Sequence, residues 1–334
     1  KVVITNTETN GNNNATFGNL NQITRTSNTI AGGKSNTVTD SSNCQVTGDT
    51  NSSNNVDNSI TIGKSNSVVD VSNAAIFGLS NQVKTTTLNS LVSGKSHIET
   101  TGTNNALFGE EHETTTTTNT LSTGKNHTIT TANQSLISGK DNTGSTITNV
   151  FVTGESNNIS NSTNTSVLGK SMTITGNNNS FLTGKSNGET NGNQNALFGE
   201  SNTTNNSNNT MVGGKSNTVA TTERNITFGL SNNITNGTDN ITIGQSNTVL
   251  DTTYSGIIGT SHDISSNTFG TLSVGKSHKE WKGRFNITGG ESNQIVNSSN
   301  MTIGGLSNKM VDGSNNIIQG RQNVLTNVYN SGVI

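Results

Sequence analysis

The sequence of 334 residues contains no proline, one tryptophan and one cysteine, Cys44. A lone cysteine excludes a disulfide framework within the chain. No run of about 18 apolar residues occurs, so the sequence predicts no membrane-spanning helix. Charged residues make up only 11% and the formal net charge is −2, which argues against nucleic acid as a partner.

Large apolar residues are also scarce, since all hydrophobic types together reach 26%. Such a composition is usual in disordered chains. Disorder normally comes with high net charge or many prolines, and this sequence has neither. Repetition is therefore the expected source of order.

One glycine recurs every 15 residues, with two steps of 16, from Gly78 to Gly94 and from Gly259 to Gly275. We number each repeat from this glycine, which is position 0. Position +3 is Asn in 15 of 21 coils, position +5 is usually aliphatic and position −5 is usually Asn. One repeat reads Asn58-Ser-Ile-Thr-Ile-Gly-Lys-Ser-Asn-Ser-Val68.

Both halves of this repeat contain Asn-x-apolar, and period-two alternation places the two residues on the inward face of a short strand. The sequence thus predicts an all-β fold, a parallel β-solenoid or β-roll of about 21 coils of 15 residues. We expect a single domain over residues 1–334 without evident caps. Stacked inward Asn and aliphatic residues would form ladders, and the Asn ladder would satisfy buried amides through hydrogen bonds between coils.

Position +3 holds the predicted structural ladder, and all five histidines of the chain fall on it. Its members are Asn21, Asn36, Asn51, Asn66, Asn81, His97, His112, His127, Asn142, Asn157, Asn187, Asn202, Asn217, Asn232, Asn247, His262, His278, Asn293, Asn308 and Asn323. This placement indicates histidine as an inward substitute for Asn. A metal site is the alternative, but imidazoles stacked in parallel about 5 Å apart would not converge on one ion.

Two further predictions concern packing. Four coils with Phe at position −1 have Ala at position −3, which indicates compensation of side-chain volume in the core; these pairs are Phe17 with Ala15, Phe77 with Ala75, Phe108 with Ala106, and Phe198 with Ala196. Cys44 lies between two positions predicted to face inward, so it is expected to face outward. There it would be an inert thiol or a cross-link between subunits.

No Ser/His/Asp set and no carboxylate pair departs from the repeat, so we predict a protein that is not an enzyme and uses no cofactor. One segment is rich in basic and aromatic residues, a combination that suits contact with a glycan or a cell surface. Its candidate contact residues are Lys276, Lys279, Trp281, Lys282 and Arg284. A plain irregular coil is the other interpretation.

The repeat from Asn58 to Val68 resembles the heads of trimeric autotransporter adhesins, which are left-handed parallel β-rolls on bacterial surfaces. It also resembles the x-x-Asn-x-Val-x-Gly repeats of ice-binding β-rolls, in which His sometimes replaces Asn. The resemblance implies a left-handed roll at the cell surface or outside the cell. The sequence departs from the adhesin heads, which favour Ala or Ser where Asn stands here.

We therefore expect an extracellular structural protein that is a subunit of a cell-surface or secreted fibre, with adhesion as a further role. Its partner would be the chain itself, as a homo-oligomer or a head-to-tail filament. Asn6 is already in register and Ile334 leaves a coil unfinished, and open ends of this kind recruit more strand. The alternative is ice binding by threonine pairs such as Thr37 and Thr39, an array that Lys84, Lys279, Trp281 and Lys309 interrupt.

Overall fold

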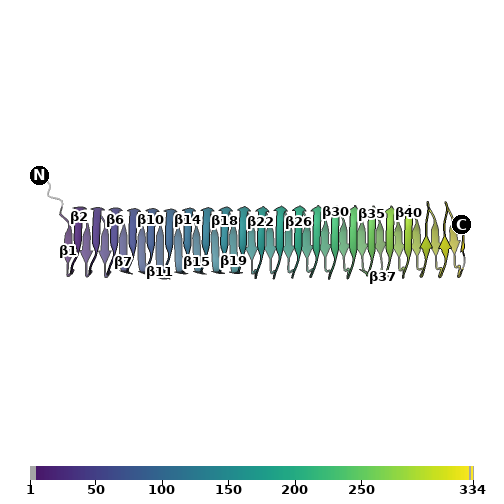
Figure 1. Ribbon diagram of the computed structural model, residues 1–334, viewed down its shortest axis with the longest axis horizontal. Coiled ribbons are helices and arrows are strands. Elements are labelled where there is room, and N and C mark those ends of the chain that lie inside the picture. Colours follow the sequence, from purple (N-terminus) through teal and green to yellow (C-terminus); the bar gives the residue numbers. More distant parts are fainter. Residues whose placement is uncertain (1–4, 331, 334) are drawn as a thin grey trace. The chain divides into compact units, whose positions relative to one another are not determined.

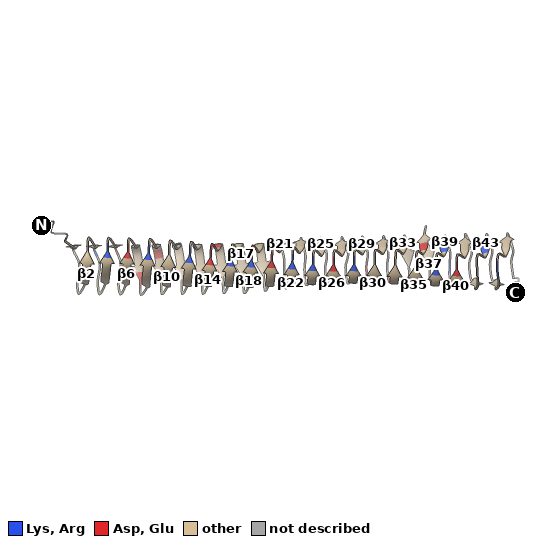
Figure 2. Cartoon of the chain, turned by 90° about the horizontal axis from the view of Figure 1, so that it is seen from above, with Lys and Arg blue, Asp and Glu red and all other residues tan. Residues whose placement is uncertain are grey.

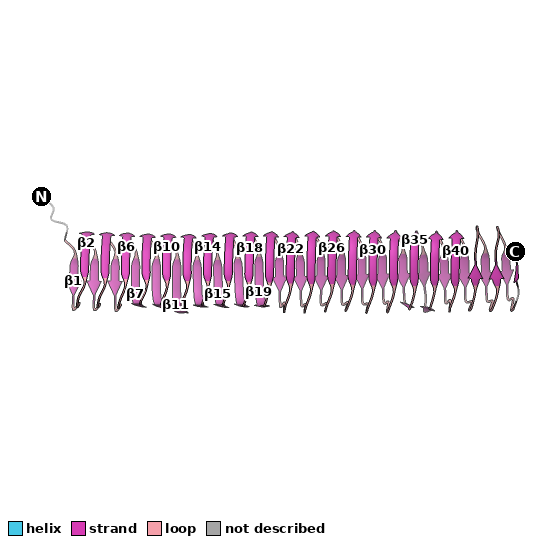
Figure 3. Ribbon diagram, in the orientation of Figure 1, coloured by secondary structure: helices cyan, strands magenta, loops and turns pink. Residues whose placement is uncertain are grey.

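The computed structural model describes residues 5–330 and 332–333, and every regular element in them is a β-strand (Figure 3). The predicted fold class is confirmed: the chain is a parallel β-solenoid of about 21 turns of about 15 residues. It divides into two compact units, Lys1–Leu168 and Gly169–Ile334. The open ends expected from the sequence involve residues 1–4, 331 and 334, which lie outside the described residues.

Each turn of the first unit contributes one strand that contains the repeating glycine and one strand that follows position +3. The first set forms the glycine sheet: β2 (Ala15–Asn19), β4 (Ile30–Lys34), β6 (Gln45–Asp49), β8 (Ile60–Lys64), β10 (Ala75–Leu79), β12 (Leu91–Lys95), β14 (Ala106–Glu110), β16 (Leu121–Lys125), β18 (Leu136–Lys140) and β20 (Phe151–Glu155). The boundary between the units falls within β22 (Ser166–Lys170). The second set, rich in threonine, forms the threonine sheet: β1 (Thr7–Thr9), β3 (Gln22–Thr24), β5 (Thr37–Thr39), β7 (Ser52–Asp57), β9 (Ser67–Ser72), β11 (Gln82–Leu88), β13 (Ile98–Thr103), β15 (Glu113–Thr118), β17 (Thr128–Asn133), β19 (Thr143–Thr148) and β21 (Asn158–Ser160).

The second unit repeats this plan. Its glycine sheet consists of β24 (Phe181–Lys185), β26 (Ala196–Glu200), β28 (Met211–Lys215), β30 (Ile226–Leu230), β32 (Ile241–Gln245), β35 (Gly256–Thr260), β38 (Leu272–Lys276), β40 (Ile287–Glu291), β42 (Thr302–Ile303), β44 (Ile317–Ile318) and β46 (Gly332–Val333). Its threonine sheet consists of β23 (Thr173–Thr175), β25 (Gly188–Thr190), β27 (Thr203–Asn205), β29 (Thr218–Ala220), β31 (Asn233–Thr235), β33 (Thr248–Leu250), β36 (Asp263–Ser265), β39 (Lys279–Trp281), β41 (Gln294–Val296), β43 (Lys309–Val311) and β45 (Val324–Thr326). A short pair, β34 (Thr252–Thr253) and β37 (Thr268–Phe269), lies on a third side.

Successive turns pair in parallel with the repeat in register. Gly63 pairs with Gly78, which in turn pairs with Gly94. Strands β6, β10 and β14 accordingly follow one another in chain order along one face of the first unit (Figure 1). This register stacks equivalent positions, so every repeated side chain becomes part of a row along the unit.

Three corners close each turn, and each has a residue in the left-handed region. In one turn these residues are Ser65 at +2 (φ 57°), Asp70 at +7 (φ 56°) and Asn73 at −5 (φ 57°). Asn and Asp adopt this region several times more often than other non-glycine residues. The two 16-residue steps place their extra residue at the +7 corner, where Thr85 with Thr86 and Ser266 with Asn267 are all left-handed.

The repeating glycine is required both by its backbone and by the neighbouring turn. Gly63 has φ +134°, and a Cβ built on it would overlap the carbonyl oxygen of Gly78. Side chains rarely adopt such a φ, and the neighbouring backbone cannot move without breaking its own ladder. The spacing of 15 residues therefore marks the positions where adjacent turns approach most closely.

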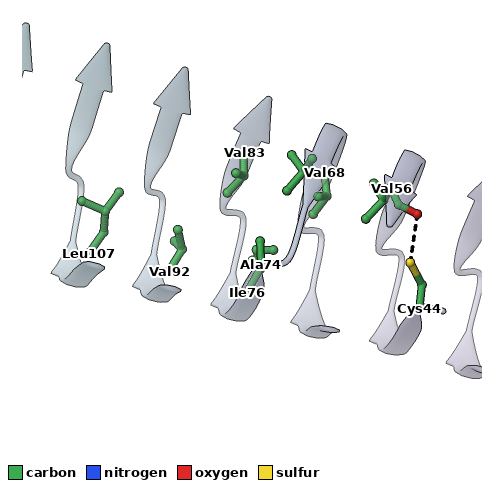
Figure 4. Packing of buried hydrophobic residues seen from close by; sticks show 9 residues of the cluster. Cys44, Val56, Val68, Ala74, Ile76, Val83, Val92 and Leu107 are labelled. Carbon is green, nitrogen blue, oxygen red and sulfur yellow. Dashed lines mark hydrogen bonds between the residues drawn. The ribbon is translucent and has the colours of Figure 1, made fainter. Parts of the chain in front are cut away.

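The inward faces agree with the sequence prediction in one sheet and not in the other. Positions +3 and +5, before and within the threonine sheet, face inward: Asn66 at +3 is buried, and so are Val68 and Val83 at +5 (Figure 4). In the glycine sheet the predicted inward set, −5, −3 and −1, is wrong by one residue. Ile76 at −2 is fully buried, whereas Ile60 at −3 and Ile62 at −1 are 39% and 36% exposed. A shift of one residue moves every side chain of a strand to its other face.

The same shift corrects two other predictions. Cys44 at −4 faces inward, 3% exposed, and its Sγ lies 3.1 Å from the carbonyl oxygen of Val56 (Figure 4). The expectation that Cys44 faces outward is wrong, and a cross-link through this thiol would require the turn to open. The Phe and Ala pairs lie on the outer face, since Phe17 is 62% exposed, so they level that face and do not fill the core.

Candidate functional site

Along the interior row at position +3, hydrogen bonds join the Asn side chains of adjacent turns, and the runs of Asn end where His or Met172 takes their place. Asn36 Nδ2 donates to Asn21 Oδ1 at 3.0 Å and to the carbonyl oxygens of Gly32 and Gly48 at 2.7 and 3.0 Å. Asn21 Oδ1 also accepts from the backbone N–H of Asn36 at 3.0 Å. Of the twenty predicted members, all but Asn323 are buried. Each amide thus meets its hydrogen-bonding needs inside the turn, and a buried amide left without partners would cost about 1–3 kcal/mol.

His97, His127 and His278 reproduce the hydrogen bond of the Asn that they replace, because Nδ1 of each accepts from a backbone N–H one turn later. In His112 and His262, Nδ1 meets a serine hydroxyl instead. The backbone N–H of Asn142 donates to His127 Nδ1 at 3.3 Å, so this nitrogen carries the lone pair. His127 Nε2 lies 3.0 Å from the carbonyl oxygen of Thr123 and donates to it. Both contacts select the neutral ring, and burial lowers the pKa of His127 and takes the pKa of His112 to about 4.

The sequence prediction assumed that the imidazole rings stack in parallel, and the rings of the first unit do not. His262 and His278 in the second unit are nearer to parallel, at 34° with centroids 4.9 Å apart. The centroids of His97 and His112 are 4.7 Å apart with the rings at 83°, and those of His112 and His127 are 4.8 Å apart at 69°. The edge of one ring therefore meets the face of the next. Within the described residues, no group of three or more His, Cys, Asp or Glu side chains could hold a metal ion.

A second interior feature escaped the sequence analysis. Three glutamates at position +5, Glu99, Glu189 and Glu280, are almost completely buried. Burial raises the pKa of each carboxyl, and that of Glu280 to about 7. Each Oε1 accepts hydrogen bonds from an Asn six residues later and from a Ser or Thr nine residues earlier, while Oε2 has no partner among the described residues.

A glycine three residues after each glutamate makes room for the carboxyl. A Cβ on Gly192 would overlap Glu189 Oε1. The same three-residue set recurs at Glu8, Gly11 and Asn14, where Asn14 Nδ2 donates to Glu8 Oε1 at 2.7 Å. The motif Glu-x-x-Gly-x-x-Asn, repeated at intervals of 91, 90 and 91 residues in the sequence, is the signal that would have revealed these sites.

The charged residues of the glycine sheet stand at position +1, the last residue of most of its strands, next to the +2 corner. Acidic and basic residues are interspersed along it in each unit (Figure 2). Glu110 lies between Lys95 and Lys125 at 2.9 and 3.1 Å, and Glu200 lies 3.3 Å from Lys215. Such exposed pairs stabilise by about 0–1 kcal/mol each, so they limit self-repulsion along the corner more than they hold the fold.

The structure distributes the candidate contact residues over different sides of the second unit. Lys276 ends β38 and pairs with Glu291 at 3.4 Å. Lys279 and Trp281 begin and end β39 in the threonine sheet, and Lys282 is the left-handed residue at the next corner. Arg284 lies beyond that corner and lines a cavity on the third side.

The outer face of the glycine sheet carries a run of apolar residues in each unit, which ends at Gln45 in the first unit and at Gly256 in the second. At position −3 of the first unit, every strand from β8 to β20 pairs one apolar residue with the next: Ile60, Ala75, Leu91, Ala106, Leu121, Leu136 and Phe151. In the second unit the row runs through Phe181, Ala196, Met211, Ile226 and Ile241. Exposure of its larger members reaches 40% at Phe151 and 44% at Ile241.

Comparisons with known proteins add little to this description. No known family model matches the chain, and no curated protein matches it. Among solved structures, the chain has a weak similarity to a crystal structure assigned as an acetyltransferase from Desulfovibrio desulfuricans G20, with 7% identity and a TM-score of 0.14. The alignment covers 90% of this chain and 63% of that chain, which is less than two thirds of its length. A similarity this low supports no inference about fold or activity.

Two expectations from the sequence are affected by these findings. No family model supports the resemblance to adhesin heads and ice-binding rolls. The structure confirms only the β-roll architecture that this resemblance implied. In the described part of the chain, no helix has the length and apolar character needed to cross a membrane.

Proposed function

We propose that this chain is a non-enzymatic structural protein, a β-solenoid subunit of an extracellular or cell-surface fibre that associates with copies of itself. The observation that carries the proposal is the apolar row on the outer face of the glycine sheet. In the first unit this row passes through Leu91, Leu121 and Phe151 without a polar interruption. Contiguous apolar surface on a soluble protein marks a site of interaction.

The surroundings of the row favour a protein partner. One rim carries a ladder of Asn side chains at position −5, in which Asn89 Nδ2 donates to Asn104 Oδ1 at 2.9 Å. The other rim carries the charged residues at position +1, such as Lys95 and Glu110. An apolar centre with a polar rim is the usual anatomy of a protein interface.

The spacing of side chains in the row favours a second copy of the chain as the binding partner. Side chains in it recur at the distance between paired strands, about 4.8 Å. A flat surface with the same period would interdigitate with it along its whole length, and another copy presents such a surface. The pairing of Ala106 with Phe108 on one strand keeps the face level, which favours close approach of two faces.

The test compares the full chain with a variant whose row is polar. Leu121→Thr, Leu136→Thr and Phe151→Thr together replace the apolar side chains of three adjacent strands by a polar residue that still favours strands. We expect sedimentation velocity to show oligomers for the native chain and a monomer for the variant, with electron microscopy showing filaments only for the native chain. The control, Ile98→Thr on the threonine sheet, should associate like the native chain. A native chain that stays monomeric at high concentration would refute the proposal.

Ice binding is the second candidate, and one observation favours it. Thr100, Thr115 and Thr130 pair across three adjacent strands on the outer face of the threonine sheet. Such a row presents hydroxyl and methyl groups at regular intervals. A thermal-hysteresis assay that shows no ice shaping by the full chain would remove this candidate.

A further inference from the structure

A cavity of about 510 Å³ opens on the third side of the second unit, between the +7 and −5 corners. Asn236 and Asp251 line it from one corner and Phe285 from the other, with Arg284 and Phe269 between them. Cavities of about 300–1,000 Å³ hold small ligands. The cavity lies where the extra residue of the second 16-residue step enlarges the turn, and Asn267, one of the two left-handed residues there, forms part of its wall.

Two aromatic rings, Phe269 and Phe285, line this cavity and Tyr254 lies beside Phe269, in a chain that is only 4% aromatic. Phe269 contacts Tyr254 on one side and Phe285 on the other, with centroids 5.3 and 5.2 Å apart and rings at 84° and 83°. Tyr254 and Phe285 are each 58% exposed. These rings are therefore surface groups that the core does not need.

The backbone at the outer two rings points to the same conclusion. Tyr254 and Phe285 occupy position −5 with φ 55° and 52°, a region that bulky residues avoid and Asn tolerates. Backbone strain of this kind at two exposed residues points to a functional role for them. Most other turns place Asn at this corner, as at Asn300 and Asn315.

The first unit supplies an internal comparison. It accommodates the same extra residue at Thr85 and Thr86, yet its equivalents of Tyr254 and Phe285 are Asn73 and Asn104. The enlarged turn thus does not require aromatic residues. Their presence in the second unit calls for an explanation other than folding.

Polar groups of both kinds flank the rings. Among the described residues Arg284 has no ion-pair partner, whereas Arg25 and Arg224 each pair with an Asp one turn later. Asp251 accepts a hydrogen bond from Asn236 Nδ2 at 2.9 Å, which leaves its other oxygen for a ligand. The guanidinium only donates and the carboxylate only accepts, so a ligand that satisfies both must carry donors and acceptors side by side.

We propose that this cavity binds a neutral saccharide. A sugar ring offers a flat C–H face that can pack on Phe285 and hydroxyl groups that both donate and accept. One guanidinium and one carboxylate give the lining no net charge, which favours an uncharged sugar over an acidic one. The site is independent of self-association, because it lies on the third side and not on the apolar face of the glycine sheet.

The test applies the full chain to an array of neutral oligosaccharides and their sialylated counterparts, followed by calorimetry with the neutral sugar that binds best. We expect binding to neutral members and an affinity about tenfold lower for Phe285→Asn, a loss of about 1.4 kcal/mol, since the variant removes the ring on which the sugar packs. Phe285→Asn restores the residue usual at this corner, so folding should persist, as circular dichroism will show. Arg284→Ser, which copies Ser299 of the next turn, provides a second variant.

The control is Tyr329→Ser, which removes an exposed aromatic ring of the same unit that lies outside both the cavity lining and the apolar row. Its affinity should equal that of the native chain. The proposal is overturned if no neutral oligosaccharide binds, if only sialylated ones bind, or if folded Phe285→Asn and Arg284→Ser both bind as tightly as the native chain. Loss of oligomers in the apolar-row variant would leave saccharide binding unchanged, so failure of one proposal is distinguishable from failure of the other.

Discussion

Replacing Gly192 by serine should unfold one turn of the second unit, and a second substitution should restore it. A Cβ at Gly192 would overlap both Glu189 Oε1 and Asn195 Nδ2. The carboxyl must then leave its place and give up the hydrogen bonds donated by Asn195 and Ser180, at 2.7 and 2.9 Å. Overpacking costs about 1–3 kcal/mol and a buried polar group left unpaired costs a similar amount. We expect a total near 3 kcal/mol.

The compensating change is Glu189→Val. Other turns combine an aliphatic residue at +5 with serine at +8, as Val38 and Ser41 do, and Ser41 Oγ there donates to the carbonyl oxygen of Thr39 at 2.7 Å. The double variant, Glu189→Val with Gly192→Ser, should therefore recover most of the lost stability. The coupling energy expected for two residues in direct contact is about 1–3 kcal/mol.

Hydrogen exchange measured by mass spectrometry on peptides from this turn is the appropriate assay, because a solenoid can open locally. Gly188→Ser is the matched control. Its Cβ would approach nothing closer than the carbonyl oxygen of Thr173 at 4.0 Å, and protection should not fall. The steric argument is refuted if Gly192→Ser exchanges like the native chain, or if the double variant is no better protected than Gly192→Ser alone.

Four other predictions follow from buried groups and close contacts. Because the pKa of His112 falls from 6.5 to about 4 in the folded chain, stability present above pH 6.5 should be lost as the pH falls toward 4, by roughly 3 kcal/mol; urea titrations should show this acid limb flattened in His112→Asn. The pKa of Glu280 rises from 4.5 to about 7, so its contribution should be present below pH 4.5 and lost as the pH rises to 7, a trend that Glu280→Gln abolishes. Gly63→Ala should expose amides of its own and the next turn to exchange, since its Cβ meets the Gly78 carbonyl. The buried thiol of Cys44, whose pKa is raised by desolvation, should react with a thiol reagent only as fast as its turn opens, and a fast reaction in the folded chain would contradict the inward placement.

The period and the polar slot could be predicted from the sequence because both are tied to one unambiguous residue. Gly63 and its equivalents fix the register, and a row of Asn and His at +3 is explained only by a shared interior environment. The same reasoning failed for the glycine sheet, where residues 60–62 read Ile-Thr-Ile and offer an apolar residue to either face. Asn58 added to the error, since Asn serves equally in an inward ladder and at a left-handed corner.

The size of the side chains would have shown which positions of the glycine-sheet strands face inward. No aromatic residue occurs at −4 or −2 in any turn, whereas Phe occurs repeatedly at −3 and −1, as at Phe151 and Phe108. The narrow interior admits residues no larger than Leu or Met at those positions. The buried glutamates were missed for a different reason: a charged residue type at an aliphatic position looks like an interruption until Gly192 and Asn195 are seen as its partners.

The composition that first suggested disorder is a consequence of the fold. Every turn needs three residues in the left-handed region, and Ser65, Asp70 and Asn73 fill these places in one turn. Proline fits none of them, since its ring fixes φ near −65° and it has no N–H for the ladders between turns. Interior positions filled by Asn and Thr replace hydrophobic burial with hydrogen bonds that repeat in each turn. A chain can therefore hold 26% hydrophobic residues and still have a fully ordered core, provided that its neighbours along the axis are copies of the same turn.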